Sequence, residues 1–184
     1  MNILYNYGIK LNQQYNLSNI RKIYNLSNNQ WFINLLNYHN YELYIKYNLS
    51  YLLDLLDLNF LINLNYDIIY RNNNNNNYEL NWHLDDKKLI IQKISNLNKL
   101  HNLDIIHINK NIYALYSNRI TLYTIIIYLD TFNINFRGGK IEFIDQILEP
   151  YRGMILFFDS RDIHKITKLN KGIRRCIVIK FYFN

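Results

Sequence analysis

Two histidines and one aspartate have the residue types and the spacing of metal ligands. His83 and Asp85 are separated by one residue in the segment Trp-His-Leu-Asp. Side chains alternate between the faces of an extended strand, so these two would point to the same side and could meet at one ion. Ferrous iron favours two imidazoles and one carboxylate on one face of its coordination sphere, with the other positions open. The second imidazole must come from elsewhere in the chain, and the candidate is His164.

Arg174 adds a second kind of chemistry, because it opens a run of mostly apolar residues at 176–183. A guanidinium at the start of a buried strand requires an anion, and its forked donors suit the carboxylate of a dicarboxylic acid. Arg175 is a rival for this role. Alternation along a strand places only one of the two arginines on the inner face, and we favour Arg174, ten residues beyond His164.

The composition excludes several classes of protein. A chain of 184 residues with 49% hydrophobic content can bury a core, which argues against a disordered protein. The single cysteine, Cys176, forbids an intrachain disulfide and favours a reducing compartment. We expect an intracellular, cytoplasmic protein without a membrane segment, because no apolar run reaches 18 residues and no leader is evident. The net charge of +7 could attract nucleic acid. No feature of the sequence indicates the oligomeric state.

The amino-acid usage indicates an AT-rich coding sequence, because asparagine, isoleucine and tyrosine abound beside one proline and five glycines. Such usage suits a large DNA virus or a protist, so the location could be a viral host cell or a virion. Glycine codons are G-rich, which makes each glycine informative. Four of the five lie in the second half of the chain, where tight turns would need a permissive backbone: Gly138, Gly139, Gly153 and Gly172.

The first 65 residues are expected to form a helical support region. Residues 51–62 are almost all apolar and follow Ser50, a residue suited to cap a helix, which predicts a largely buried helix. Shorter helices are expected over residues 17–24 and 30–38. Their many asparagines are poor residues for a helix interior.

Residues 66–184 are expected to form a β-rich core. β-Branched and aromatic residues gather into short runs there, which predict strands over residues 66–70, 78–85, 120–129, 140–144, 153–158 and 173–183. The asparagines at 72–77 predict a loop, and residues 86–118 an insertion with a short helix at 89–97. The run at 120–129 is apolar on both faces, so both must be covered. We therefore expect one compact, mainly β domain of the α+β kind, a sandwich or jelly roll with helices packed outside.

An ordered set of motifs resembles a known family. The set comprises His83-X-Asp85, Tyr-Leu-Asp at 128–130, Gly-Gly-Lys-Ile-Glu-Phe at 138–143, Pro-Tyr-Arg-Gly at 150–153, Phe-Phe-Asp at 157–159, His164, and Gly-Ile-Arg at 172–174. In this order the motifs resemble the 2-oxoglutarate- and iron-dependent dioxygenases of the prolyl hydroxylase type, over about residues 66–183. The resemblance implies a double-stranded β-helix, the jelly roll of cupin-like proteins.

The resemblance also implies an activity, that of an oxidoreductase which consumes 2-oxoglutarate and O2 to hydroxylate a C–H bond, with ascorbate as a candidate reductant. The residues implied are His83, Asp85 and His164 for Fe(II), and Arg174, Tyr128 and Tyr70 for the co-substrate. A peptidyl proline is the first expectation for the substrate, ahead of other protein side chains. The alternatives are an oxidative nucleic-acid demethylase on the same fold and a non-catalytic jelly-roll binding module.

Overall fold

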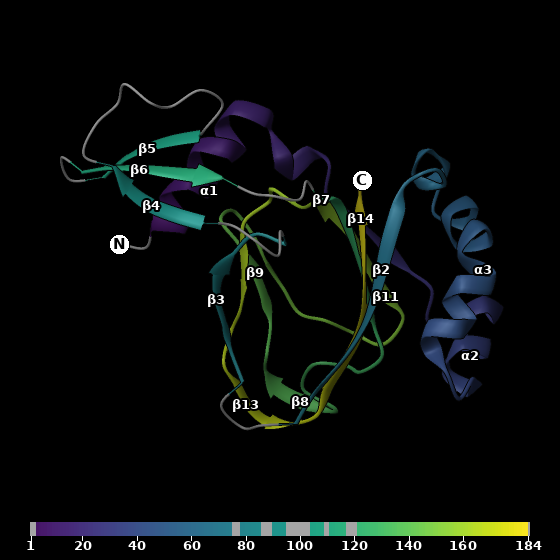
Figure 1. The fold of residues 1–184 in the computed structure, drawn as a ribbon. Helices are drawn as coiled ribbons and strands as arrows, with labels where there is room; N and C mark the ends of the chain where they lie inside the picture. Colours follow the sequence, from purple (N-terminus) through teal and green to yellow (C-terminus); the bar gives the residue numbers. More distant parts are fainter. Residues whose placement is uncertain are drawn as a thin grey trace.

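Two antiparallel sheets form the framework of the protein (Figure 1). The computed structural model describes residues 3–74, 78–85, 90–94, 104–108, 111–116 and 121–183. The larger sheet has five strands, in the order β1 (Lys22–Asn25), β11 (Met154–Asp159), β7 (Thr121–Tyr128), β14 (Arg174–Tyr182) and β2 (Asn65–Asn73). The smaller sheet has four, in the order β10 (Ile147–Leu148), β9 (Ile141–Phe143), β12 (His164–Ile166) and β3 (Leu80–His83).

Alternating side chains in the larger sheet build two separate cores. In β7, Ile125 and Ile127 pack in a cluster with the helices, whereas Ile126 and Tyr128 pack in a cluster with the smaller sheet. Because both faces of this part of β7 are buried, residues 125–128 form a continuous apolar run instead of alternating with polar residues. This arrangement confirms the expected mainly β jelly roll with helices on the outside.

Three α-helices and two short 3₁₀ helices come from the first third of the chain: α1 (Ile3–Tyr15), η1 (Leu17–Asn19), α2 (Gln30–Asn37), α3 (Tyr41–Leu55) and η2 (Asn59–Leu61). Figure 1 shows α2 and α3 beside the outer face of the larger sheet. Asparagine side chains cap the start of both helices, since Asn29 accepts a hydrogen bond from the backbone N–H of Trp31 and Asn40 from that of Leu43. None of the described helices combines the length and apolarity that a membrane span requires.

The predicted helix at residues 17–24 is wrong. Only η1 forms there, and the next residues extend as β1, where Lys22 pairs with Phe157 and Asn25 with Met154 of β11. The open edge of β11 offers backbone partners to a segment with little helix propensity of its own. A strand therefore lies within the region expected to be helical.

The helix predicted over residues 51–62 is displaced. It begins at Tyr41 and ends at Leu55, so Ser50 lies inside it and Asn40 is the true cap. Asp57, with φ of 54°, turns the chain just after this helix. The helix at 30–38 and the strands of the core lie close to their predicted positions, although β2 continues through Asn73 because it pairs with β14 up to Arg174.

The insertion contains a three-stranded sheet, in the order β4 (Ile90–Ile94), β6 (Asn111–Tyr116) and β5 (Asp104–Ile108). The helix predicted near residues 89–97 is therefore wrong at residues 90–94; the rest of that segment lies outside the described residues. β4 contains three isoleucines in five residues, and β-branched residues favour a strand once a partner such as β6 is available.

Gly172 illustrates why the rare glycines are informative. It has φ of +87°, and an added Cβ would lie 2.1 Å from the carbonyl oxygen of Asn135. No other residue fits this close approach between β13 (Leu169–Gly172) and β8 (Phe136–Gly138). The turn after Gly172 leads directly into Arg174 at the start of β14.

Candidate metal centre

Neighbouring strands bring the three predicted metal ligands together. His83 at the end of β3 and His164 at the start of β12 are directly paired, with ring centroids 4.4 Å apart. Asp85 follows β3, and its backbone N–H donates to the carbonyl of Ser160 at 3.3 Å. One ligand atom from each of the three side chains lies within 4.8 Å of the others. The closely spaced His83 and Asp85 and the distant His164 thus meet at one point.

Backbone carbonyls orient both imidazole rings. Nδ1 of His83 lies 2.7 Å from the carbonyl oxygen of Asn81, and Nδ1 of His164 lies 3.0 Å from that of Asp162. A carbonyl can only accept a hydrogen bond, so each neutral ring carries its proton on Nδ1. The lone pair on Nε2 of each ring is therefore available to a metal, and the carbonyl fixes the direction in which it points.

The protonation states of the buried groups also suit a cation. Burial lowers the pKa of His164 to about 4 despite the adjacent Asp85 carboxylate, so its imidazole is neutral at physiological pH. Burial alone would raise the pKa of Asp85, but the adjacent His164 and the Lys180 ammonium outweigh it and bring the pKa to about 2. The Oδ2 atom of this carboxylate is buried and has no hydrogen-bond partner among the residues that the structure describes. A bare carboxylate oxygen beside two imidazole lone pairs fits Fe(II).

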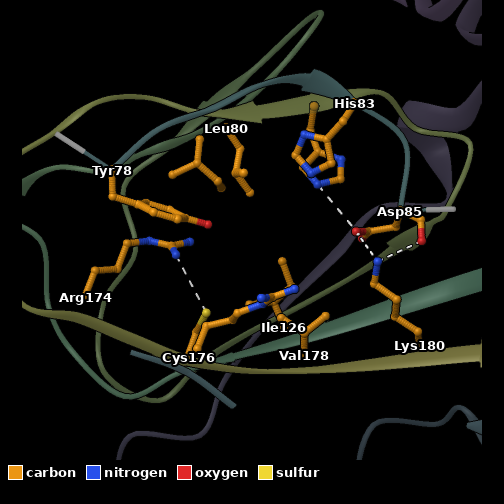
Figure 2. Close-up of a pocket in the computed structure, with 12 residues that line it drawn as sticks. Tyr78, Leu80, His83, Asp85, Ile126, Arg174, Cys176, Val178 and Lys180 are labelled. Atoms are coloured by element: carbon orange, nitrogen blue, oxygen red, sulfur yellow. Dashed lines mark hydrogen bonds and ion pairs between the residues drawn. The ribbon is translucent and has the colours of Figure 1, made fainter. Parts of the chain in front are cut away.

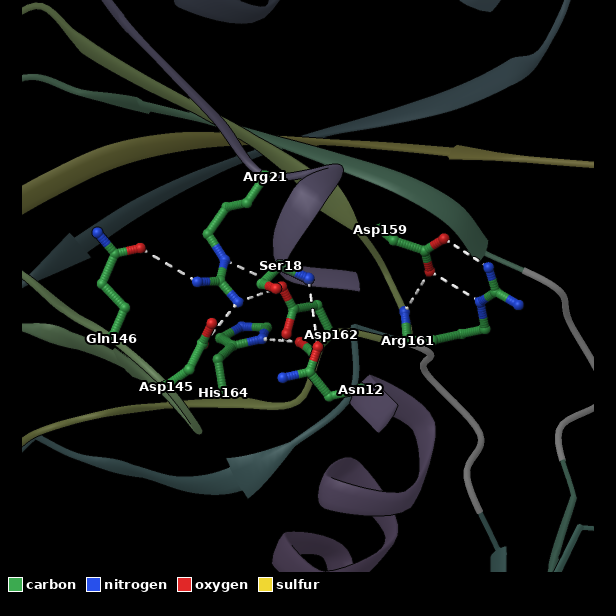
Figure 3. A network of polar contacts seen from close by, with 9 residues as sticks. All are labelled: Asn12, Ser18, Arg21, Asp145, Gln146, Asp159, Arg161, Asp162 and His164. Atoms are coloured by element: carbon green, nitrogen blue, oxygen red, sulfur yellow. Dashed lines mark hydrogen bonds and ion pairs between the residues drawn. The ribbon is translucent and has the colours of Figure 1, made fainter. Parts of the chain in front are cut away.

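A buried ion pair supports His164 from the N-terminal part of the chain (Figure 3). Arg21 donates through Nε and a terminal nitrogen to Asp162, at 3.0 and 2.7 Å, and both side chains are almost fully buried. The guanidinium also lies 3.8 Å above the centroid of the Phe143 ring, which in turn packs against His164. Arg21 therefore fixes the residue whose carbonyl orients His164, a candidate metal ligand, and no sequence motif indicates this role of Arg21.

A cavity of about 230 Å³ extends from the three ligands to Arg174 (Figure 2). Arg174 is only 2% exposed, yet none of the described residues gives it a carboxylate partner. Its one hydrogen bond within the described residues is a weak contact of 3.7 Å from a terminal nitrogen to the Cys176 sulfur, and its Nε atom has no partner there. An unpaired buried cation is costly, so an anion in this part of the cavity would lower the free energy of the site.

Two tyrosines lie beside Arg174. The Tyr128 ring centroid is 5.3 Å from the guanidinium carbon, and its buried hydroxyl has no hydrogen-bond partner in the described parts of the chain. Burial raises the pKa of Tyr128, so this hydroxyl remains protonated and can donate to an anion. Tyr78, just before β3, lines the cavity itself, whereas Tyr128 lies behind its lining. We did not predict Tyr78, although its place on the extended segment that leads to His83 was an available signal.

Tyr70 and Arg175 lie elsewhere. Tyr70 is 44% exposed, lies against Tyr41 with ring centroids 5.3 Å apart, and lines a different cavity. The structure thus places Tyr70 apart from the co-substrate pocket predicted for it, because residue 70 points outward on β2. Arg175 lines that other cavity too, where its guanidinium binds both carboxylate oxygens of Asp130 at 2.9 and 2.6 Å. Of the two neighbouring arginines, Arg174 is the one that lines the metal-site cavity, from the opposite face of β14; Arg71 of β2 lines it as well.

Comparison with known proteins gives one match in sequence and several in fold. No family model matches the chain. A stretch of 84 residues is 33% identical to the 2-oxoglutarate and iron-dependent oxygenase domain-containing protein 3 of Xenopus tropicalis, over 42% of this chain and 25% of that protein. The chain thus spans about a quarter of the length of its curated relative.

Two solved structures share the fold over nearly the whole chain. A prolyl 4-hydroxylase from Pseudomonas putida superposes with a TM-score of 0.53 at 12% identity, covering 100% of this chain and 96% of that one. A prolyl 4-hydroxylase from Phytophthora capsici gives a TM-score of 0.50 at 12% identity, covering 98% and 55%. The chain therefore shares related sequence with a 2-oxoglutarate and iron-dependent oxygenase domain-containing protein in one stretch, and the fold of prolyl 4-hydroxylases over nearly its whole length.

Proposed function

We propose that the protein is a 2-oxoglutarate- and Fe(II)-dependent dioxygenase that hydroxylates a C–H bond. The observation that carries the proposal is one cavity with two complementary ends. At one end His83, Asp85 and His164 present ligand atoms within 4.8 Å of one another. At the other end the buried Arg174 lacks an acidic partner among the described residues. A dicarboxylate that chelates a metal through one end would satisfy both.

In this proposal His83, Asp85 and His164 hold Fe(II). When bound, the iron would couple the oxidative decarboxylation of 2-oxoglutarate to succinate and CO2 with the insertion of an oxygen atom from O2 into a C–H bond. The protein supplies geometry and exclusion of water. The backbone carbonyls of Asn81 and Asp162 hold the two imidazoles in the required tautomer.

Arg174 and Tyr128 would bind the distal carboxylate of the co-substrate. The guanidinium can donate two parallel hydrogen bonds, and the protonated Tyr128 hydroxyl can add a third. Ile126 and Val178 line the same cavity and give the co-substrate methylenes an apolar surface. This end of the cavity would thus set the orientation of the co-substrate without taking part in the oxidation.

A peptidyl proline is our proposed substrate. The support is the shared fold with two proteins named prolyl 4-hydroxylases. The net charge of +7 gives little support to a nucleic-acid substrate, because two lysines at the site are ion-paired and Arg174 is buried instead of lying on a surface that could track phosphates. Lys165 contacts Glu142 at 3.0 Å, and Lys180 contacts Asp85 at 2.8 Å. We also propose that ascorbate serves as accessory reductant and that the enzyme works in a reducing, intracellular setting, which keeps iron ferrous.

Anaerobic titration tests the proposed site. Addition of Fe(II) and then 2-oxoglutarate to the protein should produce a weak visible charge-transfer band. His83→Ala and Asp85→Ala should abolish this band while leaving the protein folded by circular dichroism. A well-folded protein that gives no band would favour a non-catalytic binding module instead.

The substrate is tested separately. Proline-containing peptide arrays and alkylated oligonucleotides are incubated with the loaded enzyme, O2, 2-oxoglutarate and ascorbate, and products are analysed by mass spectrometry. Gain of one oxygen on a prolyl residue supports the proposed substrate. Oxidation confined to the oligonucleotides would assign the protein to the demethylase class.

A further inference from the structure

Among the described residues that line the cavity, Lys180 is the one lysine, and it reaches the proposed metal centre. It lies on the same face of β14 as three other residues that line the cavity: Arg174, Cys176 and Val178. Lys180 lies six positions after Arg174 on this extended strand, roughly 20 Å along the backbone. The inner face of β14 thus carries one cation toward each end of the cavity (Figure 2).

The Lys180 ammonium holds Asp85 at two points. Its Nζ atom lies 2.8 Å from Oδ1 of the carboxylate and donates to the backbone carbonyl of the same residue at 2.7 Å. The Lys180 side chain is 12% exposed and that of Asp85 is 9% exposed. A lysine that binds both the carboxylate and the backbone carbonyl of one residue fixes the position and the rotation of that carboxylate.

The two oxygens of Asp85 are consequently unequal. Oδ1 is occupied by the ammonium, whereas Oδ2 has no hydrogen-bond partner in the described structure and lies 3.9 Å from Nε2 of His164. A carboxylate can bind a cation through one oxygen or through both. Binding through both would require the cation to share Oδ1 with a positively charged ammonium, which Coulomb repulsion opposes.

We infer that Lys180 is a positioning residue that restricts Asp85 to one-oxygen ligation through Oδ2. The inference rests on the proposed function and goes beyond it. Two imidazoles and one carboxylate oxygen occupy three positions of an octahedral ion and leave three for other ligands. A second oxygen from Asp85 would take one of these positions and compete with a chelating co-substrate. Lys180 therefore protects co-substrate binding more than metal binding.

The test measures metal and co-substrate binding without turnover. Mn(II) and then 2-oxoglutarate are titrated by calorimetry into the wild type and into Lys180→Met, which removes the charge and keeps a chain of similar length. We expect Lys180→Met to bind Mn(II) within about threefold of the wild type and to bind 2-oxoglutarate at least tenfold more weakly. The Fe(II)·2-oxoglutarate absorption band should also shift in position.

Two further variants act as controls. Lys180→Arg keeps a charged donor for Oδ1 and should restore 2-oxoglutarate affinity to within about threefold of the wild type; it also serves if Lys180→Met does not fold. Lys165→Met removes a different ion-paired lysine, the partner of Glu142, and should leave the affinities for Mn(II) and for 2-oxoglutarate unchanged.

The outcomes separate the inference from the proposed function. A wild type that binds neither Mn(II) nor 2-oxoglutarate would overturn the proposed function. A wild type that binds both, with a folded Lys180→Met that matches it in both affinities, would overturn only the role of Lys180. A Lys180→Met protein that loses Mn(II) affinity tenfold or more would also overturn it, because the lysine would then be needed for the metal itself.

Discussion

Replacing Arg174 by methionine should have opposite effects on the ligand-free protein and on its complex with 2-oxoglutarate. In the ligand-free protein the guanidinium is 2% exposed, and its one hydrogen bond to a described residue is a weak contact with the Cys176 sulfur. A buried charge without a partner costs free energy that a methionine of similar length does not. Arg174→Met should therefore stabilise the ligand-free protein while it weakens binding of the co-substrate.

The magnitudes follow from the burial of Arg174. Relief of one unpaired buried cation should increase the free energy of unfolding by about 2 kcal/mol, which corresponds to roughly 4–8 °C for a chain of this size. Loss of one partner of a buried, charge-assisted pair costs about 3–5 kcal/mol, so the dissociation constant of 2-oxoglutarate should rise on the order of 10² to 10³-fold.

Thermal unfolding with Mn(II), with and without 2-oxoglutarate, measures both effects. A co-substrate concentration of about 100 times its dissociation constant stabilises the wild type by about 2.7 kcal/mol and should leave the variant unchanged. The order of melting temperatures should then reverse between the two conditions. If Arg174→Met lowers the melting temperature of the ligand-free protein by several degrees, or keeps wild-type affinity for 2-oxoglutarate, the cavity is not an anion site that depends on this arginine.

Three more sets of variants probe the same geometry. Because the pKa of His164 falls from 6.5 to about 4 on folding, only the unfolded chain takes up this proton between those values. The pKa of Asp162 is raised to about 6 by burial and acts in the opposite direction in both proteins, so the His164 effect is measured as a difference. In urea unfolding of the metal-free proteins, the wild type should lose roughly 3 kcal/mol relative to His164→Gln as the pH falls from 6.5 to about 4, and equal pH dependence of the two would contradict a neutral, buried His164. Arg21→Met breaks a buried ion pair and should lower the free energy of unfolding, measured in urea, by about 3–5 kcal/mol. Arg161→Met removes one partner of a half-exposed pair and should lower it by no more than about 1 kcal/mol. Equal losses in the two variants would contradict the supporting role of Arg21. Tyr128→Phe should weaken 2-oxoglutarate about tenfold in calorimetry and Tyr70→Phe not at all, and the reverse order would show that the cavity is wrongly assigned.

The sequence alone was sufficient to predict the residues that meet at the candidate metal centre. A spacing of two on a segment expected to be extended predicted that His83 and Asp85 lie on one side of the chain. β3 ends at His83 and Asp85 lies at a bend just after it, yet both side chains reach the point to which the structure brings His164. The choice of Arg174 over Arg175 used the same alternation, and only Arg174 of the two lines the metal-site cavity. The apolar run of β7 likewise required two covered faces. Local periodicity is a property of the backbone, so it can be read without knowledge of the fold.

Contacts between distant segments were decided only by the tertiary structure. Lys22–Asn25 is a strand because the edge of β11 is open to it, and β4 is a strand because β6 lies beside it. Arg21 meets Asp162, and Lys180 meets Asp85, across long stretches of chain that no spacing rule connects. Such pairs depend on which side chains are buried together, since burial makes an unpaired charge costly and so selects its partner. The sequence could therefore name the groups that would hold a metal, whereas the groups that hold those ligands in place became visible only in the folded chain.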